Sequence, residues 1–233
     1  MPIRAVGFDI DGTLYKAGRL YLRLFARGIR SFRLMHAFNE TRHDIRRLLD
    51  SAEYRARNIQ GIEAFHRLQA QLCAQRLHAD PEQTHEAIER FFYAAAVEPF
   101  SSIPVYPGVM ELLAELRGHG LRLGALSDFP CERKVELLGL GGMFDVVMTS
   151  EETGLVKPDR ASFDLLASRL GTSPQNILYV GNSEQYDVAG ALGAGMRAAL
   201  ITGSRRAAAK TAAEFAFSDF AQLRRYILDH LAD

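Results

Sequence analysis

The chain has 233 residues, so one large domain and a core carrying an insertion are both open. Lys and Arg number 28, as do Asp and Glu, and this balance removes any whole-molecule attraction to nucleic acid or to an anionic membrane. We therefore expect a small-molecule partner, no nucleic acid and no membrane span, since the longest apolar runs fall far short of the ~20 residues that cross a bilayer. Only two cysteines and no signal-peptide pattern favour a reduced, cytoplasmic protein.

The first predicted element is a strand. Residues 3–8 are mostly apolar and end abruptly in Asp9-Ile10-Asp11-Gly12-Thr13, as a buried parallel strand does when it reaches a loop. From residue 16 to residue 100 glycine is rare and apolar residues recur at spacings of three and four, as in Leu22, Phe25, Ile29 and Phe32. This stretch is predicted to be an all-helical insertion, a cap domain of residues 16–100.

The rest of the chain alternates between strands and helices. After Pro107 and Gly108 open a helix that runs to about residue 119, strands are predicted at 121–126, 145–149, 177–180, 197–201 and 215–217. The helices between and after them are predicted at 132–138, 159–170, 185–194 and 220–231. Such alternation implies an α/β core with a doubly wound, Rossmann-like parallel sheet, formed by residues 1–15 and 101–233.

Asp9 and Asp11 are the first candidates for chemistry. If strand geometry persists to Asp11, both carboxylates face the same way, about two rises of 3.3 Å apart. Two carboxylates this close repel unless a cation intervenes or one is protonated, and either arrangement suits phosphoryl transfer. Gly12 permits a tight turn and Thr13 adds a hydroxyl. The pair alone is equally compatible with an ordinary surface turn.

Three further groups of polar residues follow predicted strands of the core. Ser127 and Asp128 follow one strand, just before a helix whose N-terminus favours anions. Lys157 precedes another helix, and Asn182 with Asp187 follows the strand at 177–180. One edge of the sheet is thereby expected to carry four kinds of group: a nucleophile, a hydroxyl, a cation and metal ligands.

Together these motifs resemble the haloacid dehalogenase-like hydrolase superfamily. The matching residues are Asp9 to Thr13, Ser127, Lys157 with Pro158, and Gly181 to Asp187, and their order makes the signal strong. The resemblance implies that Asp9 is a nucleophile that forms an aspartyl-phosphate, while Asp11 acts as general acid and base. It further implies that Mg²⁺ is held by Asp9, the carbonyl of Asp11 and the group containing Asn182 and Asp187. The expected contacts with substrate come from Thr13, Ser127, Asp128 and Lys157.

Two positions refine the expected reaction. Family members that release halide lack an acid two residues after the nucleophile, so Asp11 favours phosphate esters. Asn182 stands where the family usually has aspartate; its amide oxygen can still bind Mg²⁺, but without negative charge. Asp128 is also unusual beside the motif hydroxyl, and a helix-capping role is the alternative for it.

Three functions remain open at this point. A magnesium-dependent hydrolase of a small phosphorylated metabolite leads, ahead of a phosphomutase with the same first half-reaction. Because Asn182 replaces the usual aspartate of the family, a non-catalytic phosphoryl-binding module is the third possibility. A receiver domain is disfavoured because the acidic pair is two residues apart and a large insertion follows.

Two other features of the sequence are a basic stretch and a set of histidines. Residues 16–57 carry 11 Lys and Arg against 4 Asp and Glu, a balance of 11 − 4 = +7, with Arg19, Arg23, Arg27 and Arg30 on one predicted helix face. Either this face is merely solvated or it attracts an anionic substrate or partner. The histidines, among them His36, His43, His66 and His119, show no metal-ligand spacing, so surface or core roles are expected for them.

Overall fold

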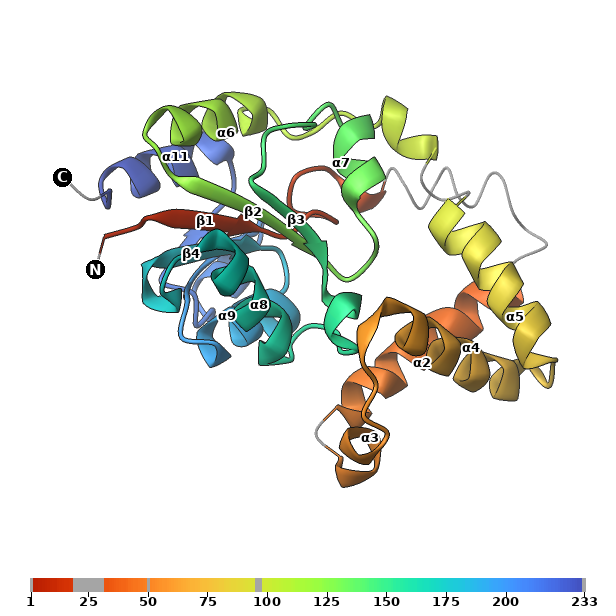
Figure 1. Cartoon of the computed structure of the whole chain (residues 1–233). Coiled ribbons are helices and arrows are strands. Elements are labelled where there is room, and N and C mark those ends of the chain that lie inside the picture. The colour runs from red at the N-terminus through yellow and green to blue at the C-terminus, as the bar shows by residue number, and fades with distance from the viewer. Residues whose placement is uncertain (1, 19–31, 50, 95–97, 232–233) are drawn as a thin grey trace.

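A parallel sheet forms the centre of the molecule in the computed structural model, which describes residues 2–18, 32–49, 51–94 and 98–231. Its six strands have the order β3-β2-β1-β4-β5-β6 (Figure 1). The strands are β1 (Ala5–Phe8), β2 (Arg122–Ser127), β3 (Val146–Thr149), β4 (Ile177–Gly181), β5 (Arg197–Ile201) and β6 (Phe215–Phe217). Each lies within two residues of its predicted bounds, and every pairing is parallel.

The strand order defines where a site can form. The chain proceeds outward from β1 through β2 to β3, then returns to the other side of β1 with β4 and continues to β6. The carboxyl ends of β1 and β4 therefore flank the topological switch point, where open α/β sheets bind ligands. Both sheet faces are apolar: Val6 and Phe8 of β1 belong to one buried cluster and Ala5 to the other. The doubly wound α/β fold is confirmed.

Helices cover both faces of the sheet (Figure 1). The core helices are α6 (Val109–Gly118), α7 (Glu132–Leu137), α8 (Arg160–Leu170), α9 (Ala189–Gly193), α10 (Arg205–Ala208) and α11 (Phe220–Leu228). Short helical turns add η3 (Glu98–Ser102), η4 (Ser150–Thr153), η5 (Pro174–Asn176) and the π-helical turn η6 (Glu184–Val188). The helix predicted at 185–194 is therefore divided into η6 and α9, and the last helix ends three residues earlier than predicted.

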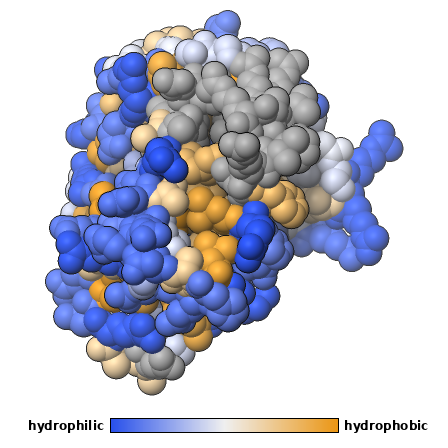
Figure 2. Space-filling view, turned by 90° about the vertical axis from the view of Figure 1, so that its right-hand side faces the viewer, coloured by the Kyte–Doolittle hydropathy of each residue, from blue (hydrophilic) through white to orange (hydrophobic). Residues whose placement is uncertain are grey.

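The described part of the predicted insertion is helical and lies to one side of the sheet (Figure 1). We call residues 32–94 the helical segment. It comprises α2 (Phe32–Leu48), α3 (Ala52–Ala56), α4 (Gly61–Leu77), α5 (Pro81–Ile88) and the π-helical turn η2 (Glu89–Ala94). Seen from its side, the molecule shows apolar residues gathered in the middle of an otherwise largely hydrophilic face (Figure 2).

The helical segment packs closely against loops of the core. One of its apolar clusters includes Val156, which follows η4, and the other contacts Phe129, which follows β2. At Gly154 the two main chains approach closely, because an added Cβ would lie 2.2 Å from the carbonyl oxygen of Ile59. The hydroxyl of Tyr54 also donates to the carbonyl of Gly154 at 3.1 Å. The two parts are thus in direct contact through main chain as well as side chains.

The structure does not describe part of the basic stretch of the sequence. The four arginines of the predicted basic face, Arg19, Arg23, Arg27 and Arg30, fall outside the described residues. Among the residues that are described, no helix is both long and apolar enough to cross a bilayer.

Candidate active site

Asp9 lies at the end of β1 in contact with a buried lysine. Its backbone N–H donates to the carbonyl of Val180 in β4, which continues the sheet by one residue. Its Oδ1 accepts a hydrogen bond from Lys157 Nζ at 2.7 Å, and its Oδ2 accepts one from Thr13 Oγ1 at 2.7 Å. The same ammonium donates to Asp187 Oδ1 at 2.7 Å. One cation therefore bridges carboxylates that follow two neighbouring strands.

Burial and charge set the protonation of this group. Burial raises the pKa of Asp9 to about 7; Lys157 opposes the rise, and the carboxylates of Asp187 and Asp11 add to it. Burial lowers the pKa of Lys157, but the carboxylates of Asp187 and Asp9 outweigh burial and hold it well above its usual range. Lys157 therefore stays charged, and its charge favours the ionised form of Asp9, which is the form that a nucleophilic carboxylate needs.

Asp11 has a separate set of partners. Its Oδ2 accepts from Ser127 Oγ at 2.9 Å and from Lys134 Nζ at 2.6 Å, and its Oδ1 accepts from the hydroxyl of Tyr15. Burial raises the pKa of Asp11, but Lys134 and the hydrogen bonds from Lys134, Tyr15 and Ser127 outweigh burial and lower it below its ordinary value. The two aspartates thus lie close together without sharing a cation, because each has its own lysine.

The loop after β4 offers oxygen donors for a cation. Asp187 Oδ2 accepts from the backbone N–H groups of Asn182 and Ser183 at 3.1 and 3.0 Å. The amide of Asn182 lies 2.9 Å from the carbonyl oxygen of Asp11, with its nitrogen donating. Gly12 makes this approach possible: its φ is 91°, and a Cβ there would lie 2.0 Å from the Asn182 amide nitrogen.

These donors fit Mg²⁺ in chemistry and in spacing. Mg²⁺ takes oxygen ligands at about 2.0–2.1 Å in octahedral geometry, so neighbouring ligand oxygens are roughly 2.9 Å apart. A half-turn of the Asn182 amide, which exchanges its nitrogen and oxygen, would bring two oxygens to that separation. Asp9 and Asp187 supply two carboxylates, each with one oxygen 2.7 Å from Lys157 Nζ.

Asp128 connects the core to the helical segment. Its Oδ1 accepts from Ser150 Oγ at 2.6 Å and from the backbone N–H of Lys157 at 3.0 Å. Its Oδ2 accepts from Arg46 Nη2 of α2 at 2.7 Å. The capping alternative is wrong, because α7 begins after Cys131 and has no side-chain cap. Both carboxylate oxygens are engaged within the protein, and contact of Asp128 with substrate stays a prediction.

Three residues of this neighbourhood carry no sequence signal. Lys134 is inside α7, Tyr15 is two residues beyond Thr13, and Arg46 is on α2, where its guanidinium lies over the Tyr186 ring at 4.5 Å and contacts the carbonyl of Lys157. None belongs to a motif: Lys134 and Arg46 reach the site through tertiary packing, and Tyr15 contacts Asp11 from four residues along the chain. Glu184, in contrast, turns away and accepts from the backbone N–H of Ala212 at 2.8 Å.

Comparison with known proteins identifies the family of the chain. The family described as haloacid dehalogenase-like hydrolase matches residues 3–195. The chain is 33% identical over 201 residues to a glyceraldehyde 3-phosphate phosphatase of Methanopyrus kandleri, covering 83% of this chain and 82% of the relative. It is 33% identical over 150 residues to a phosphoglycolate phosphatase of Rhodospirillum rubrum, covering 62% of each.

Solved structures show the same fold. A haloacid dehalogenase-like phosphatase of Thermococcus onnurineus superimposes with a TM-score of 0.63 at 23% identity, over 98% of this chain and 99% of that one. An L-2-haloacid dehalogenase superimposes with a TM-score of 0.68 at 22% identity, over 98% of this chain and all of that one. The motif residues gather at the switch point, and the family model matches most of the length of this chain. The chain belongs to the haloacid dehalogenase-like hydrolases.

Proposed function

We propose that the protein is a magnesium-dependent phosphomonoester hydrolase that acts on a small phosphorylated metabolite through an aspartyl-phosphate. The observation that carries this proposal is the Asp9 carboxylate, buried and held at 2.7 Å by Lys157, next to a second aspartate with its own lysine. Asp9 and Asp187, with the Asp11 carbonyl and the Asn182 amide, would hold Mg²⁺. When bound, the cation would neutralise charge on the phosphoryl oxygens.

In the first half-reaction a carboxylate oxygen of Asp9 bonds to phosphorus as the bond to the leaving oxygen breaks. Lys157 and the hydroxyls of Thr13 and Ser127 are placed to donate to phosphoryl oxygens, so positioning and electrostatic stabilisation supply most of the catalysis. The leaving oxygen needs a proton, which Asp11 would deliver; such a positioned acid contributes about 10²- to 10⁴-fold.

In the second half-reaction water attacks phosphorus and the bond to Asp9 breaks, which releases inorganic phosphate. Asp11, which has given its proton to the leaving oxygen, accepts the proton of this water; its lowered pKa favours the ionised form that this step needs and disfavours the protonated form that the first step needs. Lys134 at 2.6 Å then faces a carboxylate whose charge changes twice in each cycle, so we infer that it positions and tunes Asp11.

We infer that the helical segment is a cap that contacts the leaving group. Arg46 of α2 contacts both Asp128 and the carbonyl of Lys157, so the segment reaches the edge of the proposed site. A closed cap excludes bulk water during phosphoryl transfer. Relatives named for glyceraldehyde 3-phosphate and phosphoglycolate favour a substrate of two or three carbons.

A panel of phosphorylated metabolites, assayed for phosphate release with and without Mg²⁺, tests the proposal. We expect turnover of at least one small ester that depends on Mg²⁺, and loss of more than about 10³-fold in Asp9→Asn, which keeps the shape of the side chain but removes the nucleophile. Full turnover by a folded Asp9→Asn variant would exclude the mechanism. Transfer of phosphate to another sugar position would indicate a mutase, and tight binding of a phosphate mimic without turnover a binding module.

A further inference from the structure

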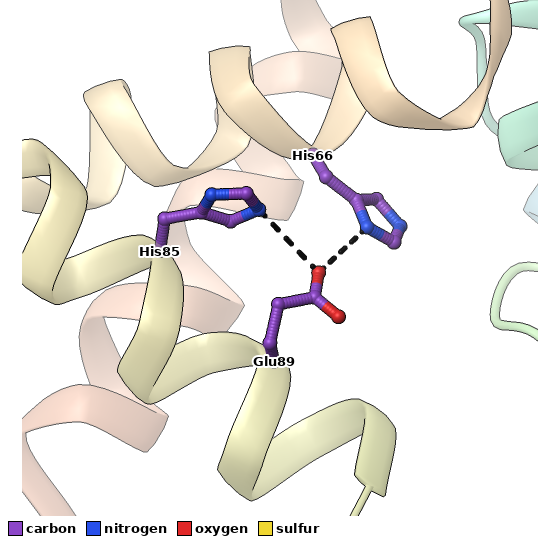
Figure 3. A group of neighbouring side chains, drawn as sticks. All are labelled: His66, His85 and Glu89. Atoms are coloured by element: carbon purple, nitrogen blue, oxygen red, sulfur yellow. Dashed lines mark hydrogen bonds and ion pairs between the residues drawn. The ribbon is translucent and has the colours of Figure 1, made fainter.

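A second group of potential metal ligands lies in the helical segment, away from the aspartates of the proposed active site. His66 of α4 and His85 of α5 converge on Glu89, the first residue of η2 (Figure 3). His66 Nδ1 lies 2.8 Å from Glu89 Oε1, and His85 Nε2 lies 3.5 Å from the same oxygen. The three ligand atoms all lie within 4.8 Å of one another.

This spacing is close to that of a tetrahedral metal site. Zn²⁺ binds imidazole nitrogen and carboxylate oxygen at about 2.0–2.2 Å, so ligand atoms in tetrahedral geometry are roughly 3.3 Å apart. The two measured contacts fall on either side of this value. His85 and Glu89 are four residues apart on one helical face, and His66 approaches from the neighbouring helix, so small side-chain rotations would complete the arrangement.

The other nitrogen of His66 provides an independent indication. Nε2 lies 2.9 Å from Glu151 Oε2, on the core turn η4. A metal-bound histidine commonly donates its second N–H to a carboxylate, which fixes the ring and leaves the first nitrogen free to bind. Glu151 is itself neutralised, because Arg42 Nη1 donates to its Oε1 at 2.6 Å and Tyr93 donates to the same oxygen at 3.2 Å.

With Nε2–H directed to Glu151, the lone pair of Nδ1 faces a carboxylate oxygen at 2.8 Å. That contact needs a positive charge between the two atoms, supplied either by a proton on Nδ1 or by a metal ion. His85 Nε2 lies 3.5 Å from the same oxygen, so a metal ion at this point would have a second imidazole within reach.

We propose that His66, His85 and Glu89 form a zinc site in the helical segment. Two imidazoles and one carboxylate suit Zn²⁺ better than Mg²⁺ or Ca²⁺, which prefer oxygen ligands throughout. His85 and Glu89 also line an open surface hollow, from which water can complete the coordination. The metal ties α4 to α5 and, through His66 and Glu151, the helical segment to the core.

Titration of the chelator-treated full chain with zinc sulfate, in competition with a chromophoric chelator, tests the site. His85 and Glu89 side chains are 23% and 42% exposed, so His85→Ala and Glu89→Gln are expected to fold, as circular dichroism would check. We expect each variant to bind one equivalent of Zn²⁺ fewer than the wild type, or to bind it at least about tenfold more weakly. Zn²⁺ should also raise the Tm of the wild type more than that of His85→Ala.

Two controls separate this site from other zinc binding. His43→Ala removes an exposed imidazole of α2, and Asp9→Asn alters the proposed active site; both should retain the equivalent of Zn²⁺ that His85→Ala loses. Equal zinc stoichiometry and affinity in His85→Ala and the wild type would overturn the proposal. Loss of zinc binding in Asp9→Asn alone would do so as well, and His66 would then be an imidazolium between two glutamates. All readouts are binding or unfolding measurements, so they do not depend on the proposed catalytic activity.

Discussion

Asn182 determines how much negative charge the loop after β4 offers to a cation. Its amide touches the carbonyl oxygen of Asp11 at 2.9 Å, so the side chain is at the correct place for a ligand but contributes only a dipole. Lys157 meanwhile occupies the space between the carboxylates of Asp9 and Asp187. The proposed Mg²⁺ would thus be held with fewer negative charges than the family pattern provides.

Asn182→Asp is therefore expected to tighten Mg²⁺ binding by about tenfold or more, because it adds a carboxylate next to the Asp11 carbonyl. Isothermal titration of the protein with MgCl₂, without substrate, measures the change directly. Glu184→Gln is the matched control, since Glu184 bonds to Ala212 and should leave the Mg²⁺ affinity unchanged. An unchanged Mg²⁺ affinity in Asn182→Asp would show that the cation does not approach this side chain.

Lys134→Met tests the tuning of Asp11. The substitution keeps the length of a side chain that packs near the rings of Phe100 and Phe129 but removes its charge. The Asp11 pKa, now held low against burial by Lys134, should then rise. Asp11 must be ionised to accept a proton from water, so the part of the kcat profile that follows the titration of Asp11 should move to higher pH.

Arg133→Met is the control for that experiment, because Arg133 is adjacent but 69% exposed and pairs with Glu136. Its pH profile should match the wild type. A Lys134→Met profile that also matches the wild type would show that Lys134 does not act through Asp11.

At the scale of elements, two arginines of α2 contact the segments that follow the strands: Arg42 pairs with Glu151, and Arg46 pairs with Asp128. Arg46 makes a largely buried ion pair with Asp128, contacts the carbonyl of Lys157 and stacks on Tyr186. Burial would raise the pKa of Asp128, but Lys157, Arg46 and Arg42 outweigh burial and hold it well below its usual range. The pair therefore stays charged throughout the neutral and mildly acidic range.

Arg46→Met should lower the free energy of unfolding by about 1.5–3 kcal/mol, the usual contribution of hydrogen bonds to charged groups. It should also lower kcat/KM, because Asp128 contacts the backbone of Lys157. Urea unfolding and steady-state kinetics measure both effects. Arg47→Met, in which the lost side chain is 75% exposed and pairs with Asp44, should change stability by less than about 1 kcal/mol. Equal stability of the two variants would show that the Arg46 contacts do not hold α2 in solution.

For the whole molecule, the sequence predicts most of the sheet. It does not predict most of the polar contacts between residues that are far apart in the sequence. Parallel strands are buried on both faces and appear as short apolar runs, so all six were located within two residues. Asp9 and Ser127 directly follow predicted strands, and Lys157 and Asp187 lie in the segments after two others, so their meeting point at one sheet edge was predictable from the strand positions.

The remaining residues reach the site or one another through packing that no local pattern encodes. Lys134 contacts Asp11 from 123 residues away, and Arg42 contacts Glu151 from 109 residues away. The histidines illustrate the same limit: His66 was expected to have a surface or core role, since its partners His85 and Glu89 lie on another helix. The pairing of two helices had to be known before these side chains could be grouped.

The main-chain contact at Gly154 has a mechanical consequence for access to the sheet edge. Peptide groups are stiff, and no side chain separates Gly154 from the carbonyl of Ile59, so this point has little freedom to compress or slide. The bond from Tyr54 to the Gly154 carbonyl anchors the same spot from a second direction. Motion of the helical segment relative to the sheet is therefore expected to be a rotation about this point, which would have to break the ion pairs of Arg46 with Asp128 and of Arg42 with Glu151.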